Sequence, residues 1–298
     1  MDLGRTRARR VNALLERLVD DAGLFPPTAL PPADAVRRHR ADLAAGHPMH
    51  SHRLLVPVSR LAAVRAELRP GDRISVGLIA DGAPADDPAA RLRDAAAVIA
   101  DDPRLTLALA EAPVRLFGTG AADAVRAVLD ALRATDVPVF LEPATPAGAD
   151  DLLAALPRTG ARVTGAKLRC GGVRADLFPD PGTTARFLTA CARAGVPFKA
   201  TAGLHRAVRH HDPATGFTHH GYLNLLLATA TALDRPDPDA VRADLETTQP
   251  GALADRIGAL PDGRAVRALF VSYGSCSTAT PVTEAATVLD PARKDRTR

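Results

Sequence analysis

Short β-prone runs alternate with amphipathic, alanine-rich helices over most of this chain, from about His52 onward. The candidate strands are LLVPV at Leu54, RISVGLIA at Arg73, LTLALAEA at Leu105, VPVFLEP at Val137, RVTGAKLRCGG at Arg162, VPFKATAG at Val196 and ALFVSYGS at Ala268. Helices are expected between most of them, near residues 59–68, 87–101, 121–134, 148–157, 181–194 and 219–233. Because parallel neighbouring strands need a crossover connection, this alternation predicts an α/β fold with a parallel sheet.

Seven candidate strands are more than a small flavodoxin-like sheet uses, and no GxGxxG motif follows the first of them. We therefore expect a (β/α)8 barrel of the TIM type rather than a Rossmann fold. The eighth strand is expected in one of two places, either VRLFG at Val114 or the long segment after His220.

The first 48 residues are predicted to be helical. Apolar residues recur with helical spacing from about Arg7 to Ala22, and a proline break separates them from a second helix that starts near Ala33. We expect residues 1–48 to form an N-terminal helical extension and residues 49–298 to form the catalytic barrel. The apolar face of the first helix makes a homodimer a reasonable expectation.

Composition narrows the class of partner. The net charge is +4, but the arginines are scattered among acidic residues, which is typical of a solvated surface and not of a nucleic-acid partner. The three cysteines form no CxxC pair, and no apolar run is long enough for a signal peptide or a membrane span. The amino-acid bias is typical of a GC-rich coding sequence. We expect a cytoplasmic, bacterial protein without a membrane partner.

Lysine is almost absent from the chain. Only Lys167, Lys199 and Lys294 occur among 38 basic residues. An amine can lose its proton and attack a carbonyl, whereas guanidinium stays protonated, so a retained lysine indicates chemistry that arginine cannot perform. Both Lys167 and Lys199 end a predicted strand, where the active site of such a barrel lies. The alternative is that the two lysines pair with buried carboxylates or extend out of the barrel.

Other polar residues also end predicted strands. They are Asp81, Glu111, Glu142, Arg169, Thr201, Ser272 and Ser275. Glu142, Lys167 and Lys199 come from consecutive strands, so their side chains are expected to converge. We expect Lys199 to form a Schiff base, Lys167 to lower the pKa of Lys199 by like-charge repulsion, and Glu142 to transfer protons.

Two glycine-containing turns follow predicted strands, CGGV after Lys167 and YGSCS at Tyr273. Exposed backbone N–H groups at such turns can bind a phosphate or carboxylate, although a plain turn has the same signature. The expected anion contacts are Arg169, Gly171, Gly172 and Ser275.

Five of the nine histidines lie within 16 residues: His205, His210, His211, His219 and His220. Imidazole is a common metal ligand, and Asp212 and Glu142 could complete a shell, but the spacing matches no helical metal motif such as HExxH. The preferred interpretation assigns no metal. It makes His205 catalytic and His220 substrate-binding, with Thr218 as the N-cap of a following helix; a polar lid loop is the remaining alternative.

The segment FKATAG resembles the strand-ending Lys-Thr-Ser-Thr-Gly of class I aldolases of the deoxyribose-phosphate aldolase type, whose lysine forms the Schiff base. KLRCGGVR is similar to the second-lysine motif of that family, and YGSCS to its late phosphate-binding turn. The resemblance covers about twenty residues, and the two lysine motifs occur here in the reverse order. It implies that Lys199 is the nucleophile.

The sequence therefore favours a class I aldolase-like lyase that acts on a small carbonyl or anionic substrate without a cofactor. Thr201 and the His205–His220 loop are expected to cover the substrate. Two other functions stay open: a metal-dependent hydrolase or lyase that uses the histidines, and a non-catalytic, anion-binding barrel.

Overall fold

The computed structural model describes residues 13–82, 87–118, 120–157, 160–261 and 263–290. Eight parallel strands close into a barrel in the order β1-β10-β7-β6-β5-β4-β3-β2. They are β1 (Val19–Asp21), β2 (His50–Pro57), β3 (Ile74–Ile79), β4 (Leu105–Pro113), β5 (Val139–Glu142), β6 (Thr164–Arg169), β7 (Phe198–Thr201) and β10 (Phe270–Ser275). The predicted (β/α)8 fold is confirmed.

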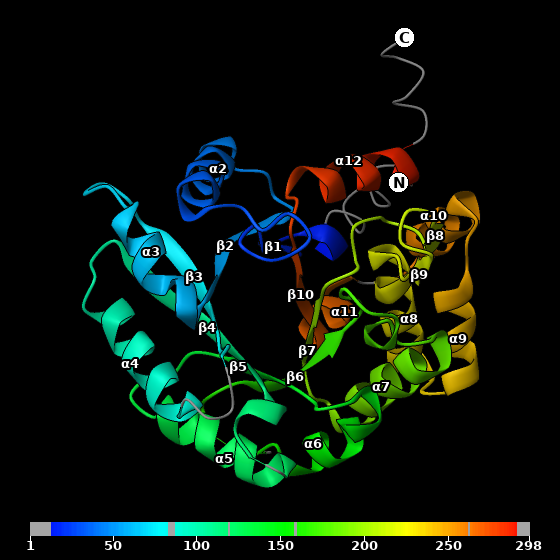
Figure 1. Ribbon diagram of the computed structural model, residues 1–298. Coiled ribbons are helices and arrows are strands. Elements are labelled where there is room, and N and C mark those ends of the chain that lie inside the picture. Colours follow the sequence, from blue (N-terminus) through cyan, green and yellow to red (C-terminus); the bar gives the residue numbers. More distant parts are fainter. Residues whose placement is uncertain (1–12, 83–86, 119, 158–159, 262, 291–298) are drawn as a thin grey trace.

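Helices surround the barrel, as Figure 1 shows. They are α2 (Pro32–Ala45), α3 (Leu61–Ala66), α4 (Pro88–Ala100), α5 (Ala121–Ala131), α6 (Ala149–Ala155), α7 (Pro181–Ala194), α8 (Tyr222–Asp234), α9 (Pro238–Glu246), α10 (Pro250–Ala259), α11 (Gly263–Leu269) and α12 (Ala279–Leu289). Their sequences explain the packing: in α5, Ala124, Val125, Val128 and Ala131 recur with helical spacing and are all buried. No helix in the described part of the chain is long and apolar enough to cross a membrane.

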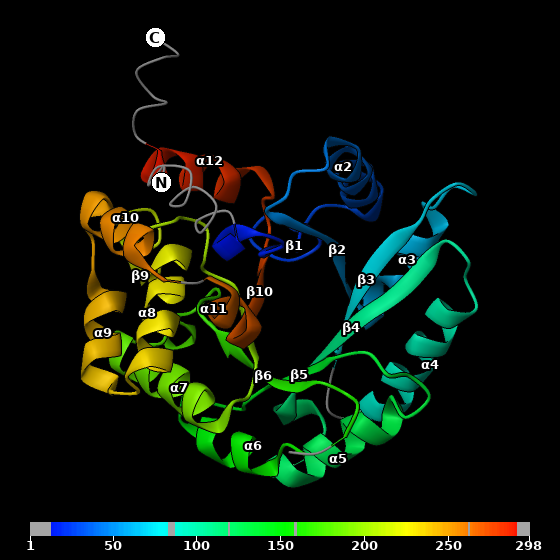
Figure 2. The ribbon, with the colours of Figure 1, turned by 180° about the vertical axis from the view of Figure 1, so that it is seen from behind.

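The eighth barrel strand lies where a helix was expected. The strand β1 pairs with β10 on one side and with β2 on the other, and the reverse view in Figure 2 shows it between them. Both positions proposed for the missing strand are wrong, because residues 114–116 form a 3-10 helix and α8 to α11 follow His220. A three-residue strand is too short to show a period of two, so only its tertiary pairing reveals it.

The N-terminal prediction is therefore right in one part and wrong in another. The second expected helix corresponds to α2, but Val19–Asp21 belongs to the barrel and not to a helical extension. Of the first expected helix, residues 7–12 lie outside the described residues, and only residues 13–15 are helical before β1. Of the apolar residues on which the homodimer was predicted, Leu14, Leu18 and Val19 are buried in the core of the protein itself. The homodimer stays a prediction.

The barrel wall separates an apolar outer layer from a polar interior. Along β7, Phe198 packs outward against Phe187 of α7, with ring centroids 5.6 Å apart, and Lys199 points inward. This alternation follows from the two-residue period of a strand. A small apolar cluster of Ala22, Leu55 and Ile79, with Phe25 against it, occupies another part of the interior. The barrel interior thus contains charged side chains such as Lys199 as well as a small apolar cluster.

Candidate active site

A chain of charged side chains runs through the barrel interior. Neighbouring members form ion pairs in the order Arg53, Asp20, Lys199, Glu111, Lys167, Glu142 and Arg169. They come from β2, β1, β7, β4, β6 and β5, with Arg169 also on β6. The four cations and three carboxylates alternate in sign, which is how a protein interior accommodates charge.

Lys199 lies at the fully buried part of this chain, with an exposed fraction of 0%. Its Nζ donates hydrogen bonds to Asp20 Oδ2 and, over 2.7 Å, to Ser272 Oγ. The Ser272 hydroxyl in turn donates to the same Asp20 oxygen over 2.8 Å. Burial raises the pKa of Asp20, but Arg53 and Lys199 outweigh burial and lower that pKa to about 2.

Glu111 stands between the two lysines. Its Oε2 lies 2.7 Å from Lys167 Nζ, and its Oε1 lies 3.3 Å from Lys199 Nζ. The register of β6 and β7 aligns Lys167 directly with Lys199, so one carboxylate reaches both amines. The two lysines were expected to act on each other by repulsion. Instead each of them pairs with buried carboxylates, which was the structural alternative.

Lys167 lies near the end of the series of ion pairs that is formed by Arg169. Burial lowers the pKa of Lys167, but Glu111 and Glu142 outweigh burial, so this pKa is raised. Glu142 Oε2 is 3.5 Å from Lys167 Nζ, and its Oε1 accepts a hydrogen bond of 2.7 Å from Arg169 Nε. Burial raises the pKa of Glu142, but Lys167 and Arg169 outweigh burial, so the net shift is downward. Arg169 is 31% exposed and marks the accessible end.

Neighbouring residues occupy the space beside Gly171 and Gly172. A Cβ at Gly171 would lie 2.8 Å from Gly203 Cα, and one at Gly172 would lie 2.4 Å from Leu177 Cδ1. The Ser275 hydroxyl donates to the Ser277 carbonyl oxygen over 2.6 Å. The side-chain space at both glycines is therefore filled by neighbouring residues, and the Ser275 hydroxyl already has a partner. The anion contacts at these residues stay predictions, and Arg169 is the member of the set with a partly exposed charge.

Thr201 ends β7 beside the charged chain. It is aligned with Arg169 on β6 and with Gly274 on β10. A Cβ at Gly274 would lie 3.8 Å from Thr201 Oγ1, so the hydroxyl is next to the inner face of β10. This position agrees with the expected contact to a bound molecule, which stays a prediction.

Part of the histidine segment forms a small antiparallel hairpin. The strands β8 (His210–Asp212) and β9 (Phe217–His219) pair antiparallel, which brings the His210 and His219 rings into a stack with centroids 5.1 Å apart. Within the described part of the chain, no group of three His, Cys, Asp or Glu residues is placed to hold a metal ion. Thr218 lies in β9, and the residue that precedes α8 is Gly221, so the expected N-cap is wrong.

His205 and His220 face different surroundings. His205 Nδ1 lies 3.6 Å from Cys276 Sγ, just beyond the end of β10. His220 Nε2 lies 3.1 Å from Thr184 Oγ1 on α7 and 2.9 Å from the Pro179 carbonyl oxygen. Burial lowers the pKa of His220 to about 4, so its imidazole is neutral at physiological pH. These contacts are those of a buried structural histidine; its expected substrate contact stays a prediction.

The sequence interpretation missed two charged members of the site. Asp20 and Arg53 complete the chain of ion pairs, yet neither was considered, because Asp20 lies in the strand that was taken for a helix. A pair of adjacent aspartates directly after the apolar residues Leu18 and Val19 was the available signal. Glu111 was noted as the end of a strand, but its place between the lysines depends on how the barrel closes.

Fold and site together define a (β/α)8-barrel protein with a charged interior. No model of a known protein family matches the chain, and no curated protein matches it. Among solved structures, it is similar to a tetrameric deoxyribose phosphate aldolase from Aeropyrum pernix, with 14% identity, a TM-score of 0.37 and coverage of 98% of this chain and 97% of that one. It is also similar to the carboxyl transferase domain of Rhizobium etli pyruvate carboxylase, with 13% identity and a TM-score of 0.41. That match covers 98% of this chain and 55% of the other.

Proposed function

We propose that this protein is a lyase that forms an imine between a barrel lysine and a small carbonyl substrate. The observation that carries the proposal is the pair Lys167 and Lys199, two of the three lysines of the chain, aligned across β6 and β7 and joined by Glu111. A lysine amine can become a nucleophile, and guanidinium cannot.

The surroundings of the two amines favour Lys167 as the nucleophile. Lys199 has two hydrogen bonds and an ion pair around its amine and is 0% exposed. Lys167 is 4% exposed, has two ion pairs, and is linked through Glu142 to the partly exposed Arg169. The sequence placed the imine on Lys199; in the proposal Lys199 instead holds Glu111 in position.

Glu111 suits the proton transfer that imine formation requires. The raised pKa of Lys167 keeps it protonated at rest, so the amine must lose a proton before it attacks. Glu111 Oε2, 2.7 Å from Lys167 Nζ, is placed to accept that proton. The amine nitrogen then bonds to the carbonyl carbon, and the carbonyl oxygen leaves as water. The resulting iminium draws electrons from an adjacent carbon–carbon bond, which weakens that bond. Arg169 would pair with an anionic group of the substrate.

Borohydride trapping tests the proposal. The full-length protein is incubated with a panel of small aldehydes, ketones and 2-oxo acids, reduced, and measured by intact-mass spectrometry. Lys167→Arg, Lys199→Arg and, as the matched control, Lys294→Arg are treated in the same way, with circular dichroism to verify folding. The expected result is a substrate-sized mass gain in wild type and Lys294→Arg that Lys167→Arg loses.

The other outcomes separate the function from the choice of lysine. Loss of the adduct in Lys199→Arg alone keeps the imine chemistry but moves the nucleophile to Lys199. No adduct with any carbonyl compound, or an adduct that survives both substitutions, contradicts the proposed function. The charged chain would then be a structural set of ion pairs.

A further inference from the structure

A cysteine and a histidine from neighbouring strand ends lie together outside the chain of ion pairs. Cys276 follows β10, His205 follows β7, and these two strands are adjacent in the barrel. The Cys276 sulfur is 3.6 Å from His205 Nδ1, within reach of a hydrogen bond that involves sulfur. From this geometry we propose that Cys276 and His205 form an activated thiol, a site of covalent modification at the carboxyl end of the barrel.

The surroundings of Cys276 favour a thiolate. Burial raises the pKa of the Cys276 thiol, but contacts with His205 and Thr28 outweigh burial, and the net shift is downward. Arg38 Nη1 donates a hydrogen bond of 2.7 Å to the Cys276 carbonyl oxygen, which fixes the backbone of this residue. A thiolate beside cationic or hydrogen-bonding partners is the reactive form of cysteine.

The other two cysteines provide an internal contrast. Cys170 and Cys191 are 0% exposed, and burial raises the pKa of each thiol well above its usual range. Cys276 is 7% exposed, and its partner His205 is half-buried. One chain therefore contains one activated thiol and two inert ones.

A second histidine accompanies the pair. The ring centroids of His205 and His219 are 6.2 Å apart. His219 Nδ1 lies 3.0 Å from the Gly203 carbonyl oxygen, and since a carbonyl only accepts, Nδ1 carries the proton. Its buried Nε2 has no hydrogen-bond partner among the described residues and is a free acceptor. Burial lowers the pKa of His219, so His205 lies beside a second imidazole that favours its neutral, hydrogen-bond-accepting form.

The reaction partners of such a site are hydrogen peroxide and alkylating reagents. With peroxide, the thiolate sulfur attacks one oxygen, the O–O bond breaks, and the sulfur is oxidised by two electrons to a sulfenic acid. The leaving hydroxide takes up the proton that the thiol had given to His205 and departs as water. The added oxygen would lie between Thr28, which follows β1, and the loop that follows β7.

Competitive alkylation tests this inference independently of the imine proposal. The folded, full-length protein is treated with limiting iodoacetamide from pH 5 to pH 9, and the three cysteines are compared by peptide mass spectrometry. We expect Cys276 to react at least about tenfold faster than Cys170 and Cys191 at pH 7, since rate follows the thiolate fraction. Peroxide followed by dimedone is expected to label Cys276 alone.

The His205→Gln variant distinguishes activation from exposure. If His205 activates the thiol, this variant moves the midpoint of the pH–rate profile of Cys276 upward and slows alkylation at pH 7 by about tenfold, the effect of one pKa unit. His205→Asn serves as a second variant if the first does not fold. An unchanged profile in a folded variant, or equal rates for all three cysteines, overturns the proposal.

Discussion

At the scale of single residues, the pair of Asp20 and Lys199 decides whether the charged interior is tolerated. Both side chains are 0% exposed, and the hydroxyls of Ser51 and Ser272 donate to the Asp20 carboxylate. A buried charge is tolerated when an opposite charge and hydrogen bonds compensate the loss of water. The removal of one partner leaves the other without compensation.

Asp20→Asn is therefore expected to destabilise the protein by about 3–5 kcal/mol, because it leaves the Lys199 ammonium buried with less opposite charge. Urea unfolding followed by circular dichroism measures the change. The double variant Asp20→Asn, Lys199→Met removes both charges and is expected to recover part of the loss. A single-variant loss below about 1 kcal/mol would show that the pair is not a compensated unit.

The sequence predicts the two lysines of the site but not the contacts between them. The scarcity of lysine identified Lys167 and Lys199, and both do point into the barrel. Chemistry alone could not say that Glu111 reaches both amines, because that depends on the register between β6 and β7 and on the closure that brings β4 into range. The same limit applies to Gly171, since its close approach to Gly203 depends on how two loops pack.

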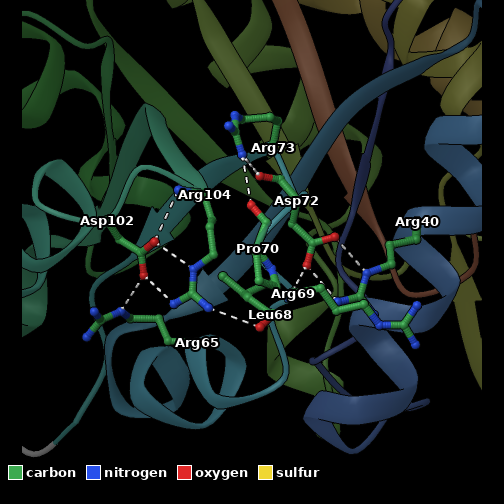
Figure 3. A network of polar contacts seen from close by, with 9 residues as sticks. All are labelled: Arg40, Arg65, Leu68, Arg69, Pro70, Asp72, Arg73, Asp102 and Arg104. Carbon is green, nitrogen blue, oxygen red and sulfur yellow. Dashed lines mark hydrogen bonds and ion pairs between the residues drawn. The ribbon is translucent and has the colours of Figure 1, made fainter.

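At the scale of elements, two aspartates tie the amino ends of β3 and β4 to neighbouring helices, as Figure 3 shows. Asp72 precedes β3 and accepts hydrogen bonds from Arg40 of α2, one of 2.9 Å from Nε. Asp102 precedes β4 and accepts from Arg65 of α3 and from Arg104. These arginine–carboxylate pairs connect α2 to the residues that precede β3, and α3 to those that precede β4.

These carboxylates predict a loss of stability in acid. The hydrogen bond from Arg40 lowers the pKa of Asp72 to about 2, and Arg104 and Arg65 lower that of Asp102. A pKa that is lower in the folded state gives stability above the unfolded value near 4, and this stability disappears as pH falls toward the folded value.

Asp72→Asn should therefore lower the melting temperature at pH 7, and its difference from wild type should shrink as pH falls from 4 to about 2. Thermal unfolding at a series of pH values measures this. Asp94→Asn is the matched control, because Asp94 pairs with Arg93 on the surface, with side-chain exposures of 72% and 58%. A difference from wild type that stays constant over the whole range would contradict the assignment.

Long elements were easier to predict than short ones. The helix α7 was expected at residues 181–194 and spans Pro181–Ala194, because Asp180 caps its start and Gly195, with φ of 62°, ends it. The hairpin of β8 and β9 was missed. Its turn is stabilised by Asp212, whose side chain accepts from the Ala214 amide, and by Gly216 at φ 72°. Three-residue strands give too little alternation to distinguish them from a loop.

At the scale of the whole molecule, barrel closure depends on β1. Without it, β2 and β10 would each present an open edge. Val19 is buried, and its amide donates a hydrogen bond of 3.0 Å to the Met49 carbonyl oxygen. This three-residue strand therefore closes the barrel by pairing with both β2 and β10.

Val19→Pro is expected to open the barrel, because proline removes the donor of that bond within a central strand. Size-exclusion chromatography and thermal unfolding should report aggregation or loss of the cooperative transition. Val19→Ala keeps the backbone donor and should fold with a moderately lower melting temperature. A Val19→Pro protein that melts like Val19→Ala would show that β1 is dispensable for closure.

The sequence by itself determined the fold class of this protein, most helices, seven barrel strands and the two inward lysines, because hydrophobic periodicity and a rare residue type are local properties of the chain. Only the tertiary structure decided that Val19–Asp21 is a strand, that Glu111 joins the two lysines, and that Cys276 meets His205. Each of these contacts joins segments far apart in sequence, and their distances depend on strand order and register, which are set when the barrel closes.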